Sequence, residues 1–99
     1  MSAVDSSTDP VGSIRVRIPT PLRSYTGGEK DVLADGSTVG EVLTDLDRRY
    51  PGMAFRVVDE QGVMRPHMIV WLHGERCRDL TALVTPADEV VLMQALSGG

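Results

Sequence analysis

The stretch STVGEVLTDLDRRYPG, residues 37–52, predicts the helix around which the rest of the fold is arranged. Thr38, with Glu41 three residues later, forms a capping box, which satisfies the first unpaired N–H groups of a helix. Pro51 and Gly52 end the helix after Tyr50. Apolar residues recur with the helical period, so one face packs against a core. That face consists of Val39, Val42, Leu43, Leu46 and Tyr50, and the charged face of Glu41, Asp45, Arg48 and Arg49.

Five stretches on either side of this helix predict β-strands. The first, SIRVRIP, alternates apolar residues with Arg15 and Arg17, which is the pattern of a half-buried strand. A proline-rich loop that closes with the turn residues Gly27 and Gly28 lets the second strand return in an antiparallel hairpin. After the helix, MAFRVV suits either a short helix or a strand. The predicted strands are residues 13–19, 29–34, 67–74, 75–78 and 88–96.

This order of elements predicts an α+β domain, with one main helix across one face of a mixed sheet of four to five strands. The stretch at 67–74 is apolar on both sides, as an interior strand is. One helix covers only one face of a sheet. The period of the last strand places Val91 and Met93 on the other face, so an apolar strip remains uncovered there. Such strips often mark partner-binding surfaces.

Length, composition and charge exclude several classes of protein. The 99 residues suffice for one domain, and 41% hydrophobic with 24% charged residues is typical of globular proteins. A net charge of -4 and a single lysine, Lys30, disfavour nucleic-acid binding, which needs clustered basic residues. One cysteine cannot form an internal disulfide, and no leader or long apolar run occurs, so we expect a cytoplasmic protein without membrane segments. We interpret residues 1–12 as a disordered arm.

His67, His73 and Cys77 are the candidate metal ligands, but their spacing lacks the close ligand pairs of a structural zinc site. We therefore expect no metal site. Arg76 and Arg78 flank Cys77 and could activate its thiol, yet the sequence supplies no neighbouring base to complete a nucleophilic site. Other catalytic motifs are missing as well, so the sequence predicts a protein that is not an enzyme.

The final stretch, LMQALSGG, joins the end of an apolar strand to a short spacer and two glycines. Glycine has no Cβ, so its backbone can enter a narrow site on another protein, and its carboxyl group is unhindered. We therefore expect Gly98 and Gly99 to be a working tail. On this interpretation the folded domain spans residues 13–96 and the flexible tail spans 97–99.

The strand and helix order, together with the two glycines, resembles the β-grasp sulfur carriers of the ThiS/MoaD family, which are ubiquitin-like in fold and tail. The resemblance covers residues 13–99. The stretches IPTPLRSYTGGEKDV, STVGEVLTDL and IVWLHGERCR are most similar to the carriers of cysteine biosynthesis. The resemblance implies that an E1-like partner, using ATP and magnesium, adenylates the Gly99 carboxylate. A sulfur donor then displaces AMP and leaves a thiocarboxylate.

The resemblance also implies the properties of the carrier itself. It would bind no cofactor, would be a monomer when free, and would donate sulfur to an enzyme that makes cysteine or another sulfur-containing metabolite. Trp71 would be either an exposed anchor for partners or a residue packed under a loop. The residues implied to contact partners are Ile69, Trp71, Val91, Met93, Leu96 and Ser97.

Three other functions stay open at this point. The small subunit of a molybdopterin synthase would keep the same tail inserted in a large catalytic subunit, through a stable and apolar interface. A ubiquitin-like modifier would instead join Gly99 to lysines of target proteins. A plain β-grasp interaction module would carry an idle tail, because this fold serves many roles.

Overall fold

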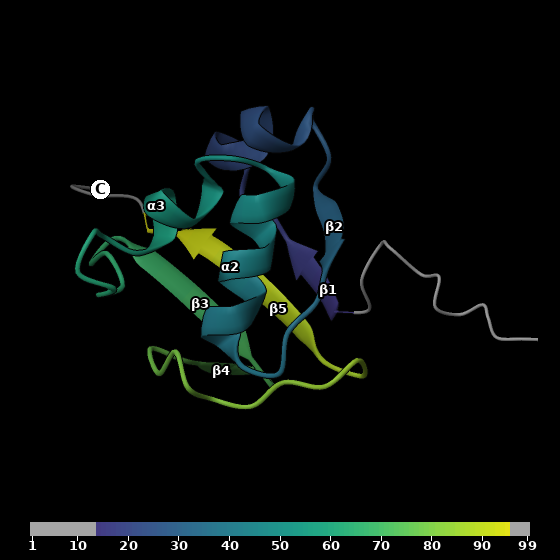
Figure 1. Cartoon of the computed structure of the whole chain (residues 1–99), viewed down its shortest axis with the longest axis vertical. Helices are drawn as coiled ribbons and strands as arrows, with labels where there is room; N and C mark the ends of the chain where they lie inside the picture. Colours follow the sequence, from purple (N-terminus) through teal and green to yellow (C-terminus); the bar gives the residue numbers. More distant parts are fainter. Residues whose placement is uncertain (1–13, 96–99) are drawn as a thin grey trace, which may run out of the picture.

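The central strand of the sheet, β5 (Glu89–Gln94), lies between β1 (Ile14–Arg17), which runs parallel to it, and β3 (Met68–Leu72), which is antiparallel. The computed structural model describes residues 14–95 (Figure 1). The strand order is β2-β1-β5-β3-β4, so the predicted mixed sheet is confirmed with five strands. The other elements are η1 (Thr20–Thr26), β2 (Asp31–Ala34), α2 (Val39–Arg49), α3 (Met53–Val57) and β4 (Glu75–Arg76).

The predicted main helix is α2, which crosses one face of the sheet (Figure 1). Its capping box forms: Thr38 Oγ1 accepts a hydrogen bond from the backbone N–H of Glu41 at 3.1 Å. The Glu41 carboxylate accepts one from the backbone N–H of Ser37 at 2.7 Å, one residue earlier than in the usual capping box. The predicted apolar face is confirmed, because Val39, Val42, Leu43 and Leu46 are buried and Tyr50 packs partly against the core.

The loop predicted between the first two strands is wrong in part, because residues 20–26 form a 3-10 helix, η1. Pro19 and Pro21 favour this start, since the fixed φ of proline suits the first turn of a helix. Gly27 and Gly28 have φ values of 66° and 92°, so they are the predicted turn residues and they end η1.

The ambiguous stretch after α2 is helical and forms α3. The Asp47 carboxylate, near the end of α2, accepts hydrogen bonds from the backbone N–H groups of Gly52 at 3.0 Å and Ala54 at 3.1 Å. These bonds satisfy N–H groups that the short helix leaves unpaired at its start. They also hold α3 at the end of the sheet where β5 ends (Figure 1).

The core lies between the helices and the inner face of the sheet. Inward-pointing residues alternate along the strands with outward-pointing ones, as the period-2 pattern predicts. The buried inner-face residues are Ile14, Val16, Val32, Ala34, Met68, Val70, Leu72, Val90 and Leu92. Within residues 14–95, no helix combines the length and apolar character needed to cross a bilayer. The predicted arm at 1–12 and tail at 97–99 fall outside the described residues.

Candidate functional site

The four sheet residues predicted to contact partners lie side by side on the face that α2 does not cover. In the pairing of β3 with β5, Ile69 is opposite Met93 and Trp71 is opposite Val91. Paired residues point to the same face of a sheet, so the four side chains form one cluster, called here the apolar strip. The Met93 side chain is 43% exposed, and the other three are partly buried. Their role in partner binding stays a prediction.

Trp71 lies on β3, between the central strand β5 and the edge strand β4. Its cross-strand neighbours are Arg76 in β4 and Val91 in β5. The indole Nε1 is enclosed and has no hydrogen-bond acceptor among the described residues. The ring as a whole is partly exposed, so Trp71 is neither fully open to solvent nor fully covered.

A groove of about 750 Å³ continues the apolar strip toward the end of β5. One wall comes from β5, and the opposite wall comes from η1 and the residues that lead into it. Arg17 lies at its edge, and the Arg17 guanidinium pairs with Asp31 at 2.9 Å. The sequence did not predict this groove, because its second wall is the unexpected 3-10 helix. Its lining includes Pro19, Pro21, Val91, Met93 and Ala95.

The lining of this groove extends to Ala95, the last described residue. The backbone N–H of Ala95 donates to the carbonyl of His67 at 2.8 Å, so β5 stays attached beside β3 up to the last described residue. The other predicted site residues, Leu96, Ser97, Gly98 and Gly99, lie outside the described residues. The described part of the site is therefore an apolar strip and a groove that extends to Ala95.

Two of the three candidate metal ligands, His73 and Cys77, have separate partners. His73 Nε2 lies 2.9 Å from Asp88 Oδ1, and the Cys77 thiol donates to the carbonyl of Asp79 at 3.5 Å. The backbone N–H of Thr85 is the main cause of the lowered pKa of Asp88, and His73 lowers that pKa further. Between residues 14 and 95, no three His, Cys, Asp or Glu side chains are grouped to hold a metal ion.

A five-stranded mixed sheet crossed by one main helix, with its central strand leading toward two glycines, defines a β-grasp, ubiquitin-like protein. The chain belongs to the ThiS family, which it matches over residues 16–99. The family and fold expected from the resemblance are therefore confirmed.

Three relatives illustrate the family. The sulfur carrier protein CysO of Mycobacterium tuberculosis is 35% identical over 92 residues, which cover 88% of this chain and 99% of CysO. A chain in the crystal structure of the Amycolatopsis orientalis BexX/CysO complex superposes with a TM-score of 0.80 at 37% identity, covering 87% of this chain and 99% of that one. Small archaeal modifier protein 3 of Haloferax volcanii is 32% identical over 78 residues, or 73% of this chain and 84% of the modifier. These names denote a carrier and a modifier, not enzymes.

Proposed function

We propose that this protein is a sulfur carrier that holds sulfur as a thiocarboxylate at Gly99. The observation that carries the proposal is the similarity to CysO, which extends over 99% of the length of that carrier. The match to the ThiS family also runs through the two glycines to Gly99. These two glycines supply the unhindered acyl group that such chemistry needs.

Activation would take place in two steps on a partner of the E1-like adenylating class. A carboxylate oxygen of Gly99 attacks the α-phosphorus of ATP, and pyrophosphate leaves with its magnesium. A sulfide nucleophile then attacks the acyl carbon. The bond between this carbon and the phosphate oxygen breaks, AMP leaves, and the thiocarboxylate remains at Gly99. The partner would bind ATP and magnesium, while the carrier would bind no cofactor of its own.

The apolar strip would be the docking surface for this partner. A half-exposed Met93 beside a partly exposed Trp71 matches the composition of interface cores, which are enriched in Met and aromatic residues. Docking would be transient, so the carrier would be a monomer when free. We also propose that it acts in the cytoplasm. The stored sulfur would pass to a second enzyme that makes cysteine or another sulfur-containing metabolite.

A second candidate function is protein modification, because a modifier of Haloferax volcanii is among the relatives. In that case the activated Gly99 would form an amide with lysines of other proteins. Extracts of cells that make a tagged form would then contain a ladder of heavier conjugates. The ladder would disappear when Gly99 is deleted.

The release of pyrophosphate tests the proposed first step. The chain is incubated with ATP, magnesium and extract fractions from its own host, and the fraction that releases pyrophosphate in response to the chain is isolated. We expect release with the wild type and with Cys77→Ser. We expect none when Gly99 is deleted or when one residue is added after it. Equal release from the extended chain would show that the Gly99 carboxylate is not the group activated.

A further inference from the structure

A second groove, on the helix side of the sheet, gathers cationic side chains beside the end of β5. It has a volume of about 320 Å³, and Arg56, Arg65, His67 and Gln94 line it beside Phe55. We call it the arginine groove. Its residues come from α3, from the approach to β3 and from the end of β5. The carbonyl of His67 accepts a hydrogen bond from the backbone N–H of Ala95, so this groove lies beside the last described residue.

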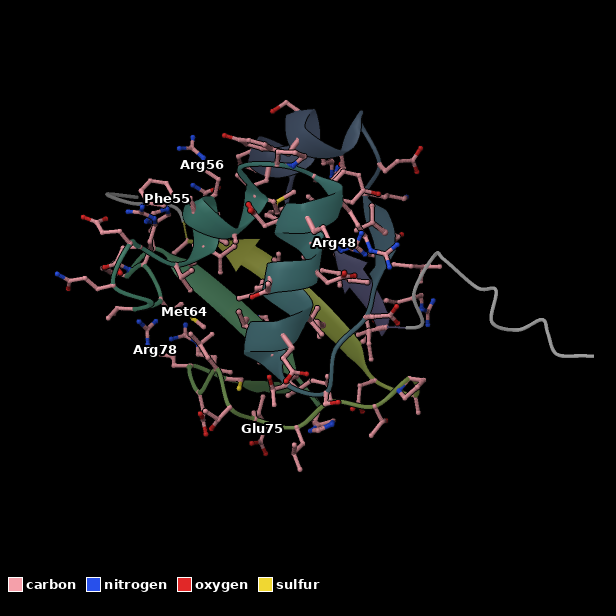
Figure 2. The ribbon with its side chains drawn as sticks, viewed as in Figure 1. Arg48, Phe55, Arg56, Met64, Glu75 and Arg78 are labelled. Carbon is pink, nitrogen blue, oxygen red and sulfur yellow. The ribbon has the colours of Figure 1, made fainter. Side chains whose placement is uncertain are left out.

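Contacts with aromatic rings and backbone hold the two arginines in place. The Arg65 guanidinium carbon lies 4.5 Å from the centroid of the Phe55 ring, and Arg65 Nε donates to the carbonyl of Phe55 at 2.7 Å. The Arg56 guanidinium carbon lies 5.7 Å from the centroid of the Tyr25 ring. Stacking uses the faces of a guanidinium and leaves N–H groups at its edge to bind carboxylates. Figure 2 shows Phe55 and Arg56 projecting from α3 at the same end of the molecule.

The positive charge of this groove contrasts with the net charge of the whole chain, which is -4. Arg17, Arg48 and Arg49 each pair with a carboxylate within 4.0 Å. Among residues 14–95, no carboxylate lies that close to Arg56 or Arg65. Arg65 does help to lower the pKa of Asp59, although the backbone N–H of Val63 lowers that pKa more. The groove therefore presents two guanidiniums that have no carboxylate partner of their own.

We propose that the arginine groove binds an acidic segment of the protein that acts on the tail. This inference rests on the proposed function, because it concerns a partner that holds Gly99. The four residues from 96 to 99 can span at most about 14 Å. A partner that holds Gly99 is therefore within about that distance of Ala95 and within reach of the groove. The Phe55 side chain is 51% exposed beside the arginines, and aromatic residues and arginine are enriched at interface hot spots. This apolar flank suits a peptide better than a small inorganic anion.

Titration of the free, isotope-labelled chain with a hexa-aspartate peptide, followed by NMR, tests the binding chemistry. We expect shifts of the Nε–H signals of Arg56 and Arg65 and of the backbone signals of His67 and Ala95. Arg56→Gln with Arg65→Gln should weaken binding about tenfold, since exposed ion pairs contribute modestly. Arg56→Lys with Arg65→Lys keeps both charges but loses the stacked guanidinium fork, so it should recover only part of the binding that the glutamine variant loses. Arg48→Gln, on the outer face of α2, is the control and should leave the affinity for the peptide unchanged (Figure 2).

Three results of this titration would overturn the inference. The peptide could fail to shift these signals, or the double glutamine variant could bind as the wild type does. Inorganic phosphate at equal concentration could also shift the same signals as strongly, which would make this a small-anion site. Because the titration needs no enzyme, none of these results bears on whether Gly99 is activated. With the activating fraction in hand, an unchanged KM for the double glutamine variant would also overturn the inference and leave the proposed function standing.

Discussion

Replacing Asp45 with asparagine removes a carboxylate that several donors hold at the surface of α2. The side chain is 13% exposed, and it accepts hydrogen bonds from the backbone N–H of Asp35 at 2.9 Å, from Arg49 Nε at 2.6 Å and from Arg48 at 2.7 Å. Burial alone would raise the pKa of Asp45. The hydrogen bonds from Asp35, Arg49 and Arg48 outweigh that effect and lower the pKa from 3.8 to about 2.

The size and sign of the effect follow from this pKa. Each pKa unit is worth about 1.4 kcal/mol, so the ionised carboxylate contributes about 2 to 3 kcal/mol to the free energy of unfolding at neutral pH. Arg48 is 67% exposed, so water screens its share, and we expect a loss of about 2 kcal/mol for Asp45→Asn. The stabilisation is fully present above the unfolded pKa of 3.8 and is lost as the pH falls through about 2. About half of it remains at a pH of about 3.

Urea unfolding of the wild type and of Asp45→Asn, measured from neutral pH to about pH 3, checks this prediction. The difference between the two midpoints should shrink as the pH falls. Glu60→Gln, at an exposed position, is the control and should change stability by less than about 0.5 kcal/mol. A difference that does not depend on pH, or an Asp45→Asn chain as stable as the wild type, would refute the role assigned to this carboxylate.

Further substitutions, two of them controls, test the core, a turn and the docking surface. Leu46→Ala, at a fully buried position of α2, should cost about 2 to 5 kcal/mol in urea unfolding because it leaves a cavity. Gly36→Ala would place a Cβ 2.7 Å from the backbone of α2 and should cost about 1 to 3 kcal/mol. Gly27→Ala has open space but φ of 66° and should cost about 1 kcal/mol; equal costs for the two alanines would contradict the clash. Met93→Glu should raise the KM for activation about tenfold with little change in stability, whereas Leu83→Glu, at another exposed position, should leave KM unchanged.

Much of the fold could be predicted because its signals are local. The capping residue and apolar spacing of α2 lie within one stretch, and each strand carries its own period. The 3-10 helix could not be predicted in the same way. Prolines and paired glycines favour an irregular loop and a short helix alike, and packing decides between them. The helix at 53–57 was ambiguous for a related reason, since its start depends on bonds to Asp47.

The candidate site could be predicted only where one strand carries the signal. The alternation in β5 predicts that Val91 and Met93 lie on the uncovered face. Their cross-strand pairing with Ile69 and Trp71 depends on the register between β3 and β5, which only the structure shows. The arginine groove had no such signal. Arg56 and Arg65 are nine positions apart in the sequence, and only the stacking on Phe55 and Tyr25 shows how they are held.

The central claim is that Gly99 carries sulfur, and the intact mass of the chain tests it most directly. The Cys77→Ser variant is incubated with ATP, a sulfide source and host extract, so that thiol chemistry is confined to the end of the chain. We predict a mass gain equal to the replacement of one oxygen by sulfur, on a group that a thiol-selective reagent alkylates and that is lost when Gly99 is deleted. An unchanged mass, in an extract that converts a known sulfur carrier, would contradict the account.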